Sequence, residues 1–349
     1  MTRVTTVVGE PPADWDDLTV APPGGQVLQG AAWAVHRAAS GWRPRYVRFE
    51  DGRAALLLTR RQSPFPGFLA YAPRGPISAG DAPEAVARRA IALADWVRGR
   101  GGTILAVDPV LDADPIYDEL LARAGFRETE EIQPSRHRMI VDLPADGDVE
   151  EAFRRLSKQT RQRVRAAEKA GTLVEHDDAG THLEGFGELV DAAAERKHFT
   201  FAAERGFVAW WRRVLATGQA SFHVALNDGQ LLGGLLAYRQ GGTWATAFSG
   251  DRADRRRDRP GTMHLLRWHL IEEATRQGLA WIDLGGVDTP GHRRLPEPGD
   301  PGHGLYEHKV GFGARWVESA AAHEAVLRSW VYRAGLATRS LRRLVKPRR

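Results

Sequence analysis

Short strand-like segments and amphipathic helix-like segments alternate along this chain, and the same order of segments occurs twice. In the first half, two strands within 45–61 precede a helix over 83–100 and a short strand at 103–107. In the second half, three strands within 221–249 precede a helix over 261–277 and a strand at 280–284. The recurrent order indicates two layered α/β units, each with helices packed on a central sheet. Further helices are expected at 114–124, 149–157, 158–170, 181–197 and 206–217, and a further strand at 137–143.

The length of 349 residues suits two domains of about 150 residues each. The turn-rich segment Pro144–Asp148 predicts the boundary, so that the first domain covers 1–146 and the second covers 147–317. A final helix over 318–349 is expected to pack back on the first domain, because chain ends often lie close together.

Composition excludes several classes of protein and of site. Cysteine is absent, which excludes disulfides, thiolate chemistry and sulfur-ligated zinc. The histidines show no ligand spacing, even where His292, His303 and His308 share one segment, so no metal site is predicted. No signal-peptide pattern and no run of about 18 apolar residues occur. We expect a cytoplasmic monomer.

The formal net charge of +5 is modest, but the basic residues are concentrated in a few stretches. Arg154–Arg165 and Arg252–Arg259 are candidates to bind a polyanion such as nucleic acid. The tail Arg339–Arg349 is a candidate for contact with the anionic inner face of a membrane. The alternative, that these stretches are solvated helix faces of an arginine-rich protein, stays open.

Seven short motifs occur in one order along the chain. They are Gln29-x-x-x-Trp33, Tyr71–Ile77, Gln133-Pro134, Lys158–Gly171, Glu195–Phe199, Asp283–Gly286 and Leu305–Gly313. Each motif is weak alone, but the ordered set resembles the FemABX transferases over roughly residues 25–345. That resemblance implies a fold of two tandem GNAT-like acyltransferase domains. No heptad run is present, so the coiled-coil arm of some members is not expected.

The resemblance also implies a reaction. Such proteins transfer an amino acid from aminoacyl-tRNA to the side-chain amine of a peptidoglycan precursor, either lipid II or UDP-MurNAc-pentapeptide. Aminoacyl-tRNA is then a co-substrate and no cofactor is needed. The ester that links the amino acid to tRNA is already activated. The enzyme therefore mainly orients the two substrates and places positive charge near the oxyanion that develops on the ester carbonyl.

Two residues are predicted to be catalytic. Lys309 corresponds to a lysine that the resemblance implicates in catalysis, and Gly311 and Gly313 beside it would let a ligand approach the backbone. Asp108 follows a predicted strand, where α/β folds place ligand-facing groups. It is a candidate base, or an anchor for the incoming ammonium; anchoring needs less change in its pKa.

Five residues are predicted to contact substrate. Arg37 replaces a family lysine implied to contact precursor phosphates, which keeps the charge and changes the geometry. Arg74 either binds phosphate or braces its loop, and the proline-rich turn favours bracing. Phe248 replaces a family tyrosine, so a hydroxyl that would orient the acceptor is missing. Trp33 and Arg196 complete the set by their motif positions.

Contacts to tRNA phosphates are predicted for Lys158, Arg161, Arg165 and Arg256. Binding of this kind is driven by phosphates and weakens steeply with salt. The segment 257–262 opens a helix with a single glycine and a proline, so ordinary coenzyme A binding at that helix end is not expected.

Two alternatives remain open on the sequence. One is the same tRNA-dependent transfer redirected to a small-molecule or peptide amine in a specialised pathway, which the Phe248 replacement favours. The other is a non-catalytic RNA- or envelope-binding module. Retention of both Asp108 and Lys309 argues against that module.

Overall fold

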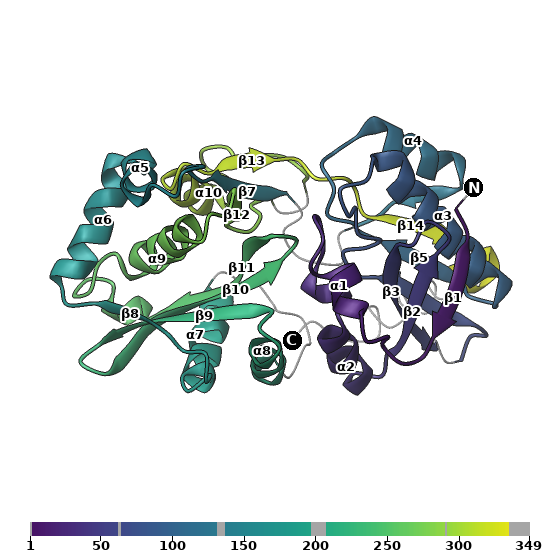
Figure 1. Ribbon diagram of the computed structural model, residues 1–349, viewed down its shortest axis with the longest axis horizontal. Coiled ribbons are helices and arrows are strands. Elements are labelled where there is room, and N and C mark those ends of the chain that lie inside the picture. The colour runs from purple at the N-terminus through teal and green to yellow at the C-terminus, as the bar shows by residue number, and fades with distance from the viewer. Residues whose placement is uncertain (1, 62–63, 131–136, 197–206, 290–291, 335–349) are drawn as a thin grey trace. The chain divides into compact units, whose positions relative to one another are not determined.

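The computed structural model describes residues 2–61, 64–130, 137–196, 207–289 and 292–334. The chain divides into two compact units. Unit 1 consists of Met1–Pro134 together with Ser319–Arg349, and unit 2 consists of Ser135–Glu318 (Figure 1).

Unit 1 is built on a seven-stranded sheet of order β1-β2-β3-β4-β5-β14-β6. All neighbours in it are antiparallel except β4 and β5, which are parallel. Its strands are β1 (Val4–Val8), β2 (Arg43–Phe49), β3 (Ala54–Arg61), β4 (Phe68–Ala72), β5 (Ile104–Val107), β6 (Phe126–Glu128) and β14 (His323–Val326).

The helices of unit 1 begin where the sequence supplies start signals. Helix α3 has a proline in its first turn, and the N-cap Asp114 of α4 accepts a hydrogen bond from the Ile116 amide at 2.8 Å. Apolar side chains of α3 and α4 pack with inward residues of β2 to β5 in one buried core. The helices are α1 (Trp15–Thr19), η1 (Val27–Gln29), α2 (Ala31–Ala39), α3 (Pro83–Gly99) and α4 (Pro115–Arg123).

Unit 2 has a second seven-stranded sheet, of order β13-β7-β12-β11-β10-β9-β8. Here β11 and β12 form the parallel pair and all other neighbours are antiparallel. The strands are β7 (Arg138–Asp142), β8 (Leu173–His176), β9 (Ala220–Asn227), β10 (Gln230–Gln240), β11 (Thr243–Asp251), β12 (Trp281–Asp283) and β13 (Arg315–Val317).

Helices cover both faces of this sheet. Helices α5, α6 and α9 share a buried core with one face, whereas α7 and α8 lie on the other, as Figure 1 shows. The N-caps Asp148 and Ser157 start α5 and α6 by accepting backbone amide hydrogen bonds. The helices are α5 (Val149–Arg155), α6 (Lys158–Lys169), α7 (Leu183–Arg196), α8 (Phe207–Ala216), η2 (Ala253–Arg255), α9 (Thr262–Arg276) and α10 (His303–Val310).

The two units share one local arrangement. In each, a helix joins the two strands of the parallel pair: α3 joins β4 to β5, and α9 joins β11 to β12. Parallel neighbours require such a crossover, and their carboxyl ends then lie at the same edge of the sheet. Groups that follow β4, β5 or β12 are therefore brought to the edge where α/β folds bind ligands.

The order of elements confirms the prediction of two α/β units, but two details differ. The division falls after Pro134 rather than after residue 146, because β7 pairs with β12 and β13 in the second sheet. The segment from Ser319 does return to unit 1, yet its first element is strand β14, which pairs with β5 and β6, where a helix was expected. Residues 335–349, including the whole basic tail Arg339–Arg349, lie outside the described residues.

Helix lengths in the described part of the chain bear on two expectations. The longest of these helices, α3, has 17 residues, which is short for a coiled-coil arm. Within the same ranges, no helix combines the length and the apolar character needed to cross a membrane.

Candidate functional site

In unit 1, the predicted residues gather where the parallel strands β4 and β5 end. Asp108 directly follows β5 and is 4% exposed. Its Oδ2 accepts a hydrogen bond from the Tyr71 hydroxyl of β4 at 2.8 Å, and its Oδ1 accepts from the Arg74 amide at 2.6 Å. The carboxylate therefore ties the segment that follows β4 to the end of β5.

That segment has unusual backbone geometry. Arg74 has a φ of 50°, in the left-handed region that residues with a side chain rarely adopt, and the Gly75–Pro76 peptide bond is cis. The left-handed conformation of Arg74 costs energy, and such conformations persist where neighbouring groups hold them, often at functional sites. The bond from the Arg74 amide to Asp108 braces this loop through the main chain, whereas the role of the Arg74 side chain stays a prediction.

Gln29, in the first motif, holds the same segment from its other side. Its amide Nε2 donates to Pro73 O at 2.6 Å and to Leu56 O at 3.2 Å, while its Oε1 accepts from the Leu56 amide at 2.8 Å. A Cβ at Gly75 would lie 2.6 Å from that Nε2, so a larger residue there would displace the Gln29 amide from its hydrogen bonds. The motifs that begin at Gln29 and Tyr71 are 42 residues apart in the sequence, and these hydrogen bonds join them in the folded chain.

Arg37 and Trp33 lie together on α2. The Arg37 guanidinium carbon is 5.4 Å from the Trp33 ring centroid and 5.6 Å from that of Trp42, so an aromatic pair flanks the cation. Burial lowers the pKa of Arg37, and the nearby Tyr71 opposes that shift. The two predicted substrate-contacting residues therefore share one environment with Tyr71.

In unit 2, Lys309 lies in the last turn of α10 and is only 4% exposed. Its Nζ donates to Gly285 O at 2.8 Å and to Gly286 O at 3.1 Å. Both carbonyls belong to the turn after β12, where Gly285 has a φ of 79° and its amide donates to Asp283 Oδ1. The structure thus joins the Asp283–Gly286 and Leu305–Gly313 motifs around one buried amine.

The glycine two residues after Lys309 serves a packing role. A Cβ on Gly311 would lie 2.5 Å from Oγ1 of Thr160, which is buried in the first turn of α6. The Ser157 amide donates to Gly311 O at 2.9 Å, so α6 and the end of α10 are held together. Gly311 thus makes room for Thr160, which accounts for a glycine here, and the approach of a ligand stays a prediction.

Phe248 packs in an aromatic group. Its ring lies 5.1 Å from the rings of both Phe207 and Trp211 on α8. Trp211 is 1% exposed, which places it in the core, and Phe248 itself is half-buried.

The residues predicted to contact tRNA differ in their surroundings. Lys158 is exposed on α6, and exposed Arg165 lies over the Phe153 ring at 5.4 Å. The Arg161 guanidinium donates to Arg154 O at 2.8 Å and also to the carbonyl of Leu156.

The second basic stretch is partly neutralised by its own carboxylates. Arg256 forms a two-pronged ion pair with Asp251, with both nitrogen–oxygen distances 2.7 Å. Arg252 pairs with Asp254 at 3.0 Å. These pairings were not predicted, because the stretch Arg252–Arg259 was considered only for its basic charge.

A further basic loop opens α9. Gly261, with a φ of 83°, precedes the helix, and a Cβ there would lie 2.1 Å from Arg163 O of α6. Gly261 allows α6 and α9 to pack closely, and this packing explains a glycine at the position without a phosphate ligand.

Some predicted residues cannot be placed. Arg196 is the last residue of α7, and its side chain lies outside the described part of the chain. Gln133-Pro134 and Lys197–Phe199 also fall outside the described residues. Three residues that hold these sites were not predicted as site residues: Gln29, Tyr71 and Gly285. Their positions in the ordered motifs are the signal that could have identified them.

Comparison with known proteins follows the division into units. The sequence model of the FemAB family matches residues 12–117, and that of the acetyltransferase (GNAT) domain matches residues 154–295. Lipid II:glycine glycyltransferases of Staphylococcus haemolyticus (strain JCSC1435) and Staphylococcus aureus are 28% identical over 198 residues. Those matches cover 53% of this chain and 46% of each relative, so the chain spans about half the length of the curated relatives it matches.

Solved structures share the fold. A crystal structure of FemX superimposes with a TM-score of 0.75 at 18% identity, covering 95% of this chain and 99% of that one. The C-terminal domain of a putative lysylphosphatidylglycerol synthetase from Agrobacterium fabrum gives a TM-score of 0.50 at 15% identity, covering 90% and 93%. The predicted fold class of two tandem GNAT-like domains is confirmed. The ordered motifs, the FemAB match in the first part of the chain and the glycyltransferase relatives all agree with the predicted resemblance of this chain to the FemABX family.

Proposed function

We propose that this protein is an aminoacyltransferase that uses aminoacyl-tRNA to form a peptide bond on the side-chain amine of a peptidoglycan precursor. The relatives named lipid II:glycine glycyltransferase support both the reaction class and the precursor. The structural observation that carries the proposal is the buried Lys309 amine, fixed by two carbonyl oxygens at 2.8 and 3.1 Å.

Lys309 suits an electrostatic role. Burying a lysine is costly, and its position is held here by main-chain oxygens of a glycine turn. A cation placed in advance beside the reacting ester would stabilise negative charge as it develops on the carbonyl oxygen, without reorganisation during the reaction. We assign Lys309 to that role.

The chemistry balances without any further reactant. The neutral acceptor amine attacks the ester carbonyl carbon, and a tetrahedral oxyanion forms. The new carbon–nitrogen bond replaces the carbon–oxygen bond to the tRNA ribose. The proton lost by the amine ends on the departing ribose hydroxyl, so the enzyme supplies orientation and charge.

We assign precursor binding to the predicted residues of unit 1. Arg37, held between two tryptophan rings, presents a guanidinium for phosphate oxygens. Asp108 accepts hydrogen bonds from Tyr71 and Arg74 within its own unit, so its first task is to position their loop. Its carboxylate also favours an ammonium group nearby, which is the anchoring role.

The donor and the location are further parts of the proposal. Lys158 and Arg165 are exposed on α6 and are our candidates for tRNA phosphate contacts, whereas the ion pair with Asp251 makes Arg256 a weaker one. A lipid-linked precursor and a tRNA donor would both be met in the cytoplasm at the membrane surface. No cofactor is required by the transfer step.

The test offers purified protein a mixture of radiolabelled aminoacyl-tRNAs with one acceptor at a time. The acceptors are lipid II, UDP-MurNAc-pentapeptide and a panel of small amines. We expect label to reach lipid II or the UDP-linked precursor and to disappear after RNase treatment. Transfer from an acyl-coenzyme A with none from aminoacyl-tRNA would overturn the proposal, and transfer to small amines alone would replace the acceptor.

Lys309→Ala tests the role of the buried amine. We expect kcat to fall about 10²–10³-fold, as for loss of one oxyanion donor, while the KM for the precursor changes little. Lys309→Arg should recover part of the rate because it keeps the charge. Lys169→Ala removes an exposed lysine at the end of α6 and serves as the control. A folded Lys309→Ala protein with normal kcat and a much higher KM would contradict the assignment.

A further inference from the structure

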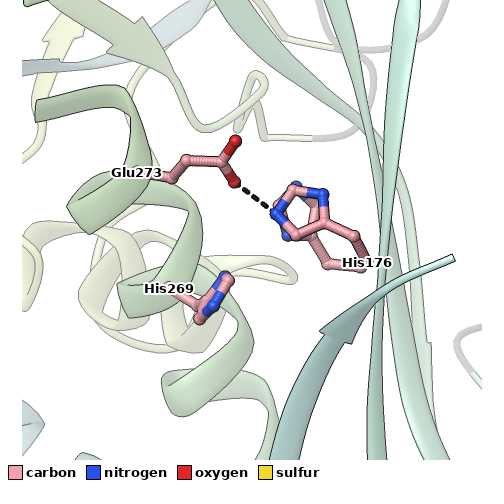
Figure 2. A group of neighbouring side chains, drawn as sticks. His176, His269 and Glu273 are labelled. Carbon is pink, nitrogen blue, oxygen red and sulfur yellow. Dashed lines mark ion pairs between the residues drawn. The ribbon is translucent and has the colours of Figure 1, made fainter. Parts of the chain in front are cut away.

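Three imidazoles and one carboxylate converge in unit 2, in a group that we call the histidine–glutamate cluster. Its members are His176, His223, His269 and Glu273, and one potential ligand atom from each lies within 4.8 Å of all the others. Figure 2 shows His269 and Glu273 on one helix, with His176 facing them from the sheet. Among the described residues, this cluster is the group in which three or more potential metal ligands lie close together.

The fold brings the cluster together through two simple spacings. His176 of β8 and His223 of β9 are direct partners in the antiparallel register, so their side chains share one face of the sheet. On α9, His269 and Glu273 are four residues apart and therefore lie on the same side of the helix. Helix α9 packs on that sheet face, so the pairs meet.

We propose that the histidine–glutamate cluster is a binding site for one divalent transition-metal ion, with Zn²⁺ the best match. Three imidazole nitrogens and a carboxylate oxygen form a ligand set that suits zinc, and four protein ligands correspond to a closed, structural site. Hard ions such as Mg²⁺ prefer all-oxygen ligands and would be rejected.

Distances within the cluster are close to those that an ion requires. Ligands at about 2.0–2.1 Å from a tetrahedral ion are separated from one another by about 3.4 Å. The His176 Nε2 and Glu273 Oε2 atoms are already 2.6 Å apart, and the full set spans 4.8 Å. Small rotations of the side chains are therefore enough, without any change in the backbone.

Hydrogen bonding selects which nitrogen of each ring is a ligand. Nε2 of His223 lies 3.0 Å from Ser221 Oγ, which leaves Nδ1 facing the cluster. The Nδ1 atoms of His223 and His269 are buried and have no hydrogen-bond partner among the described residues. A buried ring nitrogen without a partner is costly, and coordination to a metal satisfies it. Ser221 then has the usual role of orienting a ligand from behind.

The ion has a route to the site. His223 is fully buried, but the His176 side chain is 33% exposed and that of Glu273 is 19% exposed. Because β8 is the edge strand of its sheet, the outer side of the cluster reaches solvent without unfolding. Metal binding at this cluster does not depend on the transfer reaction, so its test is independent of the proposed function.

The rival interpretation is a metal-free polar network in which His176 and Glu273 form only an ion pair. Direct binding measurements distinguish the two. Full-length protein without a polyhistidine tag is stripped with a chelator and titrated calorimetrically with Zn²⁺ and with Mg²⁺. We expect about one Zn²⁺ per chain by elemental analysis after dialysis, a rise in melting temperature with Zn²⁺, and neither effect with Mg²⁺.

Matched variants locate the ion. His269→Gln and Glu273→Gln should each weaken Zn²⁺ binding by at least about 100-fold, since even loss of a residue that orients a ligand costs about 10–100-fold. Ser221→Ala should fall within that smaller range. His303→Gln, in the separate segment at the start of α10, should bind Zn²⁺ as the wild type does. Wild-type protein loaded with Co²⁺ should show the intense visible absorption of a tetrahedral ion.

Two results would overturn the proposal. One is wild-type protein that retains no Zn²⁺ and shows no tetrahedral Co²⁺ spectrum. The other is Zn²⁺ binding that is unchanged in His269→Gln and Glu273→Gln, which would mean an adventitious surface site. If either variant fails to fold, Ser221→Ala and the wild-type spectrum still decide the question, because neither removes a ligand.

Discussion

Gln29 is a buried amide that completes a sheet where a strand ends, and its replacement by leucine probes how unit 1 holds its candidate loop. The β3–β4 register pairs Leu58 with Tyr71, so Leu56 lies opposite Pro73. Proline has no amide hydrogen to continue the ladder. Instead, the Gln29 side chain accepts from Leu56 N and donates to the carbonyls of Leu56 and Pro73.

The magnitude follows from those three bonds. Gln29→Leu leaves one buried N–H and two buried carbonyls without partners, and each such group costs about 1–3 kcal/mol. The leucine side chain offsets about 1–2 kcal/mol by burying more apolar surface. We expect the free energy of opening this region to fall by about 3 kcal/mol, which corresponds to roughly 100-fold faster exchange of its amides.

Hydrogen exchange followed by mass spectrometry resolves the effect by segment. Peptides covering β3, β4 and residues 73–77 should lose protection in Gln29→Leu, whereas peptides from unit 2 should exchange as in the wild type. Gln230→Leu, at an exposed position at the start of β10, is the matched control and should change neither set. A loss below about 1 kcal/mol, or an equal loss in both units, would refute the bracing role.

Two further predictions concern the same two units. Gly285→Ala places a Cβ 3.5 Å from Lys309 Nζ at a φ of 79°, so we expect kcat in the transfer assay to fall by about 10-fold or more while the charge is kept. The hydrogen bond from Arg53, together with Arg89, lowers the pKa of Asp81. The ion pairs of Asp81 therefore stabilise unit 1 at pH values above the usual pKa of an aspartate, and this stabilisation is lost as the pH falls through the lowered pKa. The melting-temperature difference between wild type and Asp81→Asn should therefore shrink below about pH 4, as calorimetry can show; a constant difference would exclude this linkage.

Local sequence signals were enough to predict most elements that surround the candidate site. The helix over 83–100 and the strand at 103–107 correspond to α3 and β5, because proline, glycine and apolar spacing mark their ends. The expected C-terminal helix was wrong at its start. Residues 323–326 become β14 because they complete a sheet between β5 and β6, and pairing with strands about 200 residues away leaves no local trace.

The structure adds surroundings that neither motif positions nor charge alone could predict for single residues. The motif singled out Lys309, but neither its position in the last turn of α10 nor its burial against Gly285 and Gly286 of another motif was predicted. Arg256 was selected for its charge, and its pairing with Asp251 became visible only in the folded chain. A basic stretch in the sequence shows only which residues carry charge. Whether a basic side chain is available to a ligand depends on which carboxylates the fold places beside it.

The histidine–glutamate cluster shows the same limit for metal sites. Sequence motifs for zinc depend on ligands that lie a few residues apart, as His269 and Glu273 do on α9. The other two ligands come from β8 and β9, 47 residues apart, and only the β8–β9 register makes His176 and His223 neighbours. A pair of ligands on one helix is common and binds weakly, so the spacing alone does not distinguish a site from a solvated helix face. The sheet register is therefore the decisive fact. If Zn²⁺ binds as proposed, shifting β8 by one residue against β9 would turn His176 to the opposite face and remove one ligand from the site.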